Sequence, residues 1–124
     1  MSYLIIYFGG GIGAALRHGV NVMATRLMGT AFPFGTLTVN VTGSLLMGLI
    51  AGYVAYNGDS SQHWRLFLTT GILGGYTTFS AFSLDVALLY ERGDFGGVAA
   101  YTLASVLASI AGVFLGLWLM RQFA

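Results

Sequence analysis

Four long apolar stretches run through this chain of 124 residues, and they constrain its fold more than any other feature. A helix needs about 20 apolar residues to cross the hydrocarbon core of a bilayer, and each stretch is long enough. Only 7% of the residues are charged, whereas a soluble domain has about 25%. The sequence therefore predicts an all-α integral membrane protein with one transmembrane domain over residues 1–124. We expect four transmembrane helices, at about 4–27, 34–56, 66–89 and 96–120.

Charge and cysteine content exclude several classes of protein. The net charge is only +1 and the chain has no lysine, so we expect no nucleic-acid partner. No cysteine is present, which removes disulfides and thiolate metal sites. The first stretch is not expected to be a cleaved signal peptide, because it is long and no basic segment precedes it.

The arginines between the predicted spans give no clear orientation. With four spans, Arg26 and Arg92 fall on one side of the membrane, and Arg65 and Arg121 fall on the other. Orientation normally follows an excess of basic residues on the cytoplasmic side, and here the two sides balance. The balance favours a homodimer of two oppositely oriented copies. A parallel dimer in one weakly determined orientation is the alternative.

The second span carries polar side chains at regular spacing. Thr36, Asn40 and Ser44 are four residues apart, so a helix places them on one face. Thr38 or Thr42 can bond back to a carbonyl of its own helix. An amide in a membrane is costly without a partner. Asn40 is therefore expected to line a hydrated path, with hydrogen bonding between helices as the alternative.

The fourth span has a similar ladder of hydroxyl groups. Tyr101, Ser105 and Ser109 are four residues apart and share one helix face. Such a ladder can bond to a neighbouring helix, or it can provide a track for a small solute that accepts hydrogen bonds. Small residues at the same spacing predict close helix packing: Gly9 and Gly13 in the first span, Gly48 and Gly52 in the second, and Ala104, Ala108, Gly112 and Gly116 in the fourth.

The third span is expected to break near its middle. Gly74 and Gly75 are followed by Thr77, Thr78 and Ser80, which are all weak helix formers. Non-helical backbone inside a membrane is tolerated where it is buried in protein or faces a cavity, and its freed carbonyls can bind cations. An unbroken helix with a glycine-rich packing contact is the alternative.

Few charged or titratable side chains fall within the spans. Arg17, His18 and Asp85 are the candidates, and each is either a side chain reaching the membrane surface or half of a buried pair. Phe79 and Phe82 lie three residues apart on one face, and their spacing alone assigns them no role beyond packing.

Three segments together give the chain a family resemblance: GGGIGAALRH, GTLTVNVTGSLLMG and GGYTTFSAFSLD, in that order. Over essentially its whole length the sequence resembles the small fluoride channels of the CrcB (Fluc) family. The resemblance implies a dual-topology homodimer of antiparallel copies in the bacterial inner (plasma) membrane. It also implies two fluoride pores and a structural sodium ion shared by the two subunits.

The resemblance also implies roles for particular residues. It places Asn40 in the pore wall, and it has Phe79 and Phe82 present their ring edges to the anion. The positive edge of an aromatic ring can solvate a small anion without holding it tightly. The remaining implied roles are a hydroxyl track through Ser80, Tyr101, Ser105 and Ser109, sodium binding by the carbonyls of Gly74 and Thr77, and a positive potential at a pore mouth from Arg17.

Three positions depart from the pattern that the resemblance suggests. Ala81 stands where the family usually has threonine, which would reduce flux if that hydroxyl belongs to the track. His18 replaces a more frequent tyrosine, and Asp85 replaces a frequent glutamate. These departures affect local hydrogen bonding.

The function expected from the sequence is passive, selective export of cytoplasmic fluoride, which gives fluoride resistance without enzymatic activity. The alternative is a proton-coupled transporter of the small multidrug exporter type. Such a carrier needs an embedded carboxylate, expected in the first span, where this chain has none. A scaffold without transport activity would leave Asn40 and the broken span unexplained.

Overall fold

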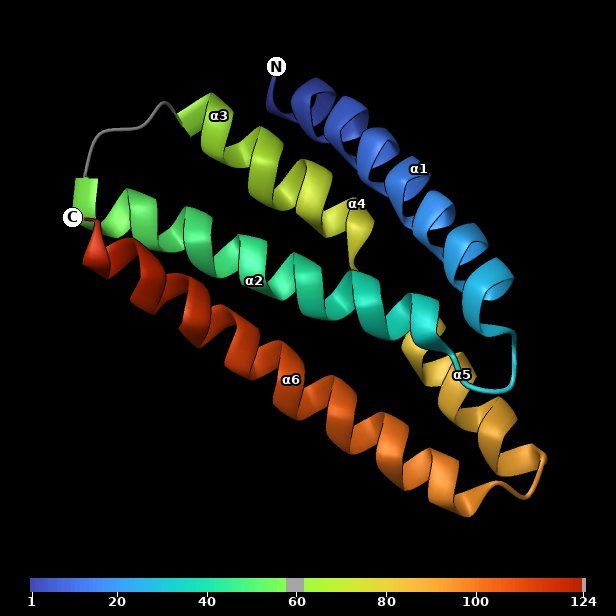
Figure 1. Cartoon of the computed structure of the whole chain (residues 1–124). Helices are drawn as coiled ribbons and strands as arrows, with labels where there is room; N and C mark the ends of the chain where they lie inside the picture. The colour runs from blue at the N-terminus through green and yellow to red at the C-terminus, as the bar shows by residue number, and fades with distance from the viewer. Residues whose placement is uncertain (58–61, 124) are drawn as a thin grey trace.

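The computed structural model describes residues 1–57 and 62–123, and the secondary structure within them is entirely helical. This confirms the all-α prediction. In chain order the helices are α1 (Ser2–Met28), α2 (Phe34–Asn57), α3 (Gln62–Leu66), the π-helix η1 (Phe67–Leu73), α4 (Gly74–Tyr76), α5 (Ser80–Glu91) and α6 (Phe95–Gln122). Figure 1 shows α2 and α6 running side by side, with α3, η1 and α4 between α2 and α1.

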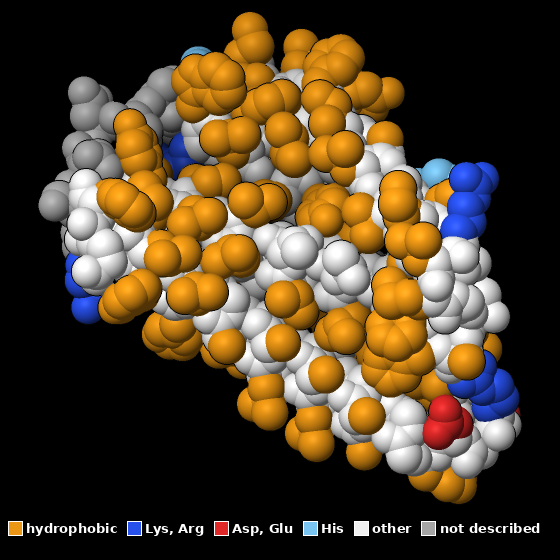
Figure 2. Space-filling view, viewed as in Figure 1, with side chains coloured by type: hydrophobic (Ala, Val, Ile, Leu, Met, Phe, Trp, Pro, Cys, Tyr) orange, Lys and Arg blue, Asp and Glu red, His pale blue; other side chains and the backbone are white. Residues whose placement is uncertain are grey.

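Within residues 1–57 and 62–123, three helical stretches are long and apolar enough to cross a membrane: Phe34–Ala55, Gln62–Glu91 and Phe95–Gln122. The chain is therefore a multi-pass membrane protein. Helix α1 is as long as the others, but Arg17, His18 and Asn21 lower the hydropathy of its second half. A fourth crossing by α1 stays a prediction. Figure 2 shows apolar side chains over most of the visible face and the charged ones near its two ends.

Glycines bring α2 and α6 into close contact. A Cβ on Gly116 would lie 2.5 Å from the backbone nitrogen of Leu49, and one on Gly48 would meet the Val113 carbonyl. Gly112 faces the backbone of Leu45 in the same way. Larger side chains would force the helices apart, so the predicted packing role of these small residues is confirmed.

A second glycine contact joins α1 to the first half of the third span. A Cβ on Gly9 would lie 2.9 Å from the Cα of Gly71, and one on Gly13 would lie 2.8 Å from the backbone nitrogen of Tyr76. The predicted packing role of Gly9 and Gly13 is therefore confirmed. A Cβ on Gly75 would meet the backbone of Gly10, so glycine is required there for α4 to approach α1 closely. Gly75 itself remains helical.

The third span breaks at residues 77–79, just after the glycine pair. Helix α4 ends at Tyr76, Thr77 takes an extended conformation with φ −82° and ψ 159°, and α5 begins at Ser80. The seven residues before α4, Phe67–Leu73, form the π-helix η1. A π-helix is rare in proteins, and where it occurs it is often at a functional site. The break was expected around Gly74 and Gly75; both are helical, and the threonines that follow them leave the helix.

The two connections after α1 and α5 lie at the same end of the molecule (Figure 1). The Arg92 guanidinium donates to the Ala31 carbonyl at 2.5 Å, which ties the connections together. Asp94 accepts a hydrogen bond from the Gly97 N–H at 2.9 Å and so caps α6. The start of α1, the end of α6 and helix α3 lie toward the opposite end (Figure 1).

Candidate functional site

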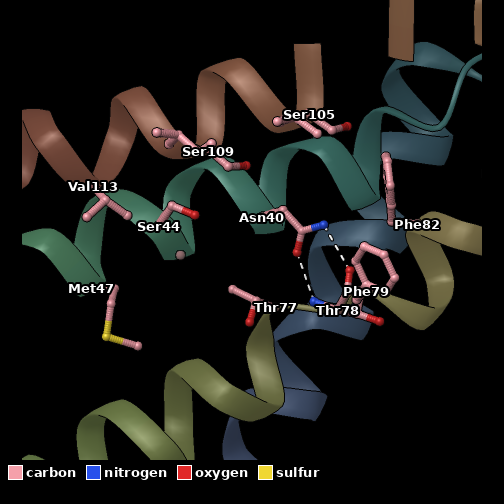
Figure 3. Close-up of a pocket in the computed structure, with 13 residues that line it drawn as sticks. Asn40, Ser44, Met47, Thr77, Thr78, Phe79, Phe82, Ser105, Ser109 and Val113 are labelled. Atoms are coloured by element: carbon pink, nitrogen blue, oxygen red, sulfur yellow. Dashed lines mark hydrogen bonds between the residues drawn. The ribbon is translucent and has the colours of Figure 1, made fainter. Parts of the chain in front are cut away.

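A cavity of about 430 Å³ lies where α2, α5 and α6 meet the break in the third span. Figure 3 shows its side chains converging from these elements. None of the described residues that line it is charged, and the polar ones carry neutral amide or hydroxyl groups. The lining consists of Asn40, Gly43, Ser44, Met47, Thr77, Thr78, Phe79, Phe82, Ser105, Val106, Ser109, Ile110 and Val113.

Asn40 holds the broken backbone through both ends of its amide. Its Nδ2 donates to the Thr78 carbonyl at 2.9 Å, and its Oδ1 accepts the Thr78 N–H at 2.8 Å. These two bonds appear as dashed lines in Figure 3. A primary amide has two N–H groups, so the second remains for another acceptor. Asn40 thus fixes the break and can also offer a donor at the cavity.

Two hydrogen bonds at the break divert backbone N–H groups away from their usual carbonyl acceptors. In a continuous helix the Gly74 carbonyl would accept the Thr78 N–H, and the Thr77 carbonyl would accept the Ala81 N–H. Here the Thr78 N–H bonds to Asn40, and the Ala81 N–H bonds to the Thr78 Oγ1 at 3.1 Å. Both carbonyls therefore lose their regular helical donors.

Hydroxyl groups from α2 and α6 complete the polar side of the cavity. Ser105 is 5% exposed, and its Oγ has no hydrogen-bond partner in the described part of the chain. Ser109 lies one helical turn along, and Ser44 approaches from α2 (Figure 3). A buried hydroxyl without a partner is costly, so Ser105 is available to a bound solute.

Aromatic rings form the other side. Phe79 is 78% exposed although it lines the cavity, and its ring centroid lies 5.7 Å from that of Phe82. The Phe82 ring packs in turn on Tyr101, with centroids 5.2 Å apart. Tyr101 is fully buried, and its hydroxyl donates to the Asp85 carboxylate at 2.9 Å.

Comparison with known sequences identifies the family of the chain. A model of the family described as "CrcB-like protein, Camphor Resistance (CrcB)" matches residues 4–117. The chain belongs to the CrcB family. The resemblance noted from the three sequence segments is thereby confirmed.

Curated relatives of this CrcB-family chain match it along nearly its whole length. A protein of Rhodopseudomonas palustris strain BisB5 named "Fluoride-specific ion channel FluC" is 64% identical over 121 residues, which cover 98% of each chain. "Fluoride-specific ion channel FluC 2" of Nitrobacter hamburgensis is 59% identical over 122 residues, again 98% of each. A Methylobacterium nodulans protein with the FluC name is 56% identical and covers 99% of this chain and 98% of its own.

The structure of this CrcB chain brings some of the predicted site residues together and leaves others apart. Asn40, Phe79, Phe82, Ser105 and Ser109 all line the cavity, as does Thr77. Tyr101 lies behind Phe82 and does not line the cavity. The Ser80 Oγ is exposed and lies 3.3 Å from the Thr78 Oγ1. Gly74 lines a neighbouring cavity.

Arg17, His18, Asp85 and Ala81 lie outside the cavity. Arg17 is partly buried on α1, His18 is exposed, and Arg17 forms no ion pair with any carboxylate that the structure describes. Asp85 pairs with the Tyr101 hydroxyl. Ala81 and Asp85 line a separate polar cavity of about 320 Å³ beside the connection between α1 and α2.

Several residues that line the CrcB site were given no role there from the sequence, Ser44, Thr78 and Met47 among them. Ser44 was recognisable, because it lies one turn from Asn40 on the same face. Thr78 supplies the backbone N–H and carbonyl that Asn40 binds, and this role became visible only once the structure showed the break at residues 77–79. Met47 lines the cavity, and no sequence signal separates it from the other apolar residues of α2.

Proposed function

We propose that this protein is a fluoride-specific ion channel that lets cytoplasmic fluoride leave the cell passively. The observation that carries the proposal is the match over 98% of the chain to relatives named as fluoride-specific ion channels. The cavity supports it chemically, since neutral donors and aromatic rings converge where the third span breaks.

The cavity lining suits conduction better than tight binding. Hydroxyl and amide N–H groups can replace part of the hydration shell of a small anion, and aromatic ring edges add positive charge density. In the part of the chain that the structure describes, no cationic side chain lines the cavity. An anion is therefore solvated without being trapped, which a channel requires.

Export needs only the membrane potential. Neutral HF crosses membranes from acidic surroundings and dissociates inside the cell, which traps fluoride as the anion. A potential that is negative inside provides about 2.3 kcal/mol per unit charge for each 100 mV. The relatives named above come from bacteria, and we place the protein in the bacterial inner membrane, where that potential exists.

We further propose a structural sodium ion bound by the carbonyls of Gly74 and Thr77 from two subunits. The support is that both carbonyls have lost their helical donors to Asn40 and Thr78. Hard cations bind oxygen ligands, and unwound carbonyls are frequent sodium ligands in membrane proteins. Bound sodium would supply positive charge that holds these carbonyls in place. Replacing sodium by a large organic cation should then lower the melting temperature of the purified dimer.

The subunits are proposed to pair as antiparallel copies. Arg26 is in the last turn of α1 and Arg92 follows α5, and the connections after these helices lie at one end of the molecule (Figure 1). Arg65 is in α3 and Arg121 is in the last turn of α6, so the charge balance gives no preferred orientation. A Phe123→Cys variant tests this, because the natural chain has no cysteine. In sealed vesicles about half of the thiols should react with an impermeant reagent from outside, whereas complete or absent labelling would indicate a single orientation.

Ion efflux from liposomes tests the function itself. Vesicles that contain purified protein and either potassium fluoride or potassium chloride are diluted, and valinomycin starts the efflux. We expect rapid fluoride loss, followed with a fluoride electrode, and no chloride loss above that of empty vesicles. Equal loss of both anions, or no fluoride loss, would contradict a fluoride-specific channel.

A further inference from the structure

A second cavity of about 760 Å³ lies between the second half of α2 and the segment formed by α3 and η1. Its polar residues are Gln62, Arg65, Thr69 and Thr70. One side is therefore apolar, and the other carries an arginine, an amide and two hydroxyl groups. The described residues that line it are Met47, Ile50, Ala51, Val54, Ala55, Gln62, Arg65, Leu66, Thr69, Thr70 and Gly74.

Met47 is shared by the two cavities. It lines the 430 Å³ cavity next to Ser44 and also the 760 Å³ cavity next to Ile50. Figure 3 shows Met47 on the side of the site opposite to Phe79 and Phe82. An unbranched thioether side chain moves easily between rotamers. Met47 is therefore an adaptable apolar side chain that both cavities share.

Among the described residues that line the second cavity, Arg65 is the charged one. Its side chain is exposed, and no described carboxylate pairs with it. Thr69 lies one turn further along, and its hydroxyl is fixed on the Arg65 carbonyl at 2.7 Å. A cation in a cleft with low-dielectric walls raises the local anion concentration. Arg17 lines neither cavity, so it is placed less well than Arg65 to act in this way.

We propose that the 760 Å³ cavity is the chamber through which small anions reach the conducting site, with Arg65 as the residue that collects them and Met47 as the constriction they pass. This inference rests on the proposed channel function, in which the 430 Å³ cavity conducts. It adds a route from water, along Arg65 and the threonines of η1, to Ser44 and Asn40. Gly74 at the far end would place the chamber beside the partner subunit, so every test uses the assembled dimer.

Flux at low fluoride concentration tests the role of Arg65, because capture then limits the rate. Arg65→Gln should lower fluoride efflux about fivefold at low ionic strength, whereas Arg65→Lys should keep most of it. Salt screens such an effect, so the two variants and the natural protein should converge at high ionic strength. An unchanged rate in Arg65→Gln, or an equal loss at both ionic strengths, would overturn the proposal.

Thiol labelling tests the chamber without relying on conduction. The natural chain has no cysteine, so Thr70→Cys introduces a single thiol. It should react with water-soluble methanethiosulfonates, and its labelling rate should be several-fold higher with the anionic reagent than with the cationic one. Adding Arg65→Gln should remove that preference. Leu107→Cys is the control, because Leu107 is 64% exposed on α6 and lines neither cavity.

The outcomes separate this inference from the proposed function. A Thr70→Cys thiol that labels no faster than Leu107→Cys, or that shows no charge preference, overturns the chamber even if fluoride conduction is established. If the natural protein conducts no fluoride, the proposed function fails, while the labelling still decides whether the chamber admits anions. Met47→Trp should stop efflux in a dimer that still assembles. Full efflux in the Met47→Trp variant would rule out Met47 as the constriction.

Discussion

Replacing Asn40 by aspartate converts a side-chain amide at the centre of the proposed pathway into a carboxylate. The carboxylate keeps nearly the same shape and can still accept the Thr78 N–H, which lies 2.8 Å from Oδ1. It cannot donate to the Thr78 carbonyl, which the amide reaches at 2.9 Å. The variant therefore loses half of the hydrogen bonding at the break and adds a negative charge to the cavity.

The charge is the larger of the two effects. A lost hydrogen bond that leaves a partly buried carbonyl unpaired costs about 1–3 kcal/mol. Two like charges about 4 Å apart repel by about 4 kcal/mol at an effective dielectric constant of about 20. Each 1.36 kcal/mol changes a rate tenfold, so the repulsion alone should slow fluoride passage by about a thousandfold.

Fluoride efflux from liposomes measures this loss, and size-exclusion chromatography checks that the dimer persists. Ser44→Asp places a carboxylate one turn away in the same cavity and leaves the bonds between Asn40 and Thr78 intact, so it should also stop efflux. Ser44→Asn is the neutral control and should retain most of the flux. More than a tenth of the natural rate in Asn40→Asp would refute the placement of Asn40 on the anion path.

Three further predictions concern other parts of the molecule. Phe79→Ile should abolish fluoride efflux and leave the dimer assembled, because it removes the ring edge; full efflux would take Phe79 out of the pathway. Gly116→Ala should lower the melting temperature, at a cost of about 1–3 kcal/mol, since its Cβ would lie 2.5 Å from a backbone nitrogen. Gly11→Ala faces open space and should not lower it; equal effects of the two would contradict the packing account. Asp85→Asn should retain fluoride efflux, because Asp85 binds the Tyr101 hydroxyl outside the cavity, and complete loss would indicate a proton-coupled carrier.

Helix packing was the part of the fold most open to prediction from sequence. Glycines at four-residue spacing make one face of a helix small, and small faces pack closely regardless of the partner helix. Gly9, Gly13 and Gly116 therefore lie in close contacts, as expected. Thr42 also bonds back to the Thr38 carbonyl at 2.6 Å, which confirms that prediction.

The position of the break was harder to predict. Weak helix formers marked the region, but Gly75 serves close approach to Gly10 and stays helical. The turn begins at Thr77 because Asn40, 38 residues earlier in the chain, binds the Thr78 backbone. Helix propensity is a local quantity, so it could not locate a break that depends on a distant side chain.

The lining of the site was predictable in part for a similar reason. Asn40, Ser105 and Ser109 were expected from hydroxyl and amide groups repeating at helical spacing, and all three reach the cavity. Tyr101 continues that spacing, but the Phe82 ring packs on it and separates it from the cavity. Spacing defines a helix face, whereas the neighbouring element decides how much of that face stays open.

The central claim is tested most directly by measuring which driving force, the membrane potential or a proton gradient, moves fluoride. Liposomes that contain the purified protein are held at the same pH on both sides, and potassium with valinomycin sets the membrane potential. A channel predicts fluoride efflux that follows the sign and size of the potential and continues when an ionophore collapses every proton gradient. Efflux that occurs only when a proton gradient is imposed would contradict passive conduction through the cavity at Asn40.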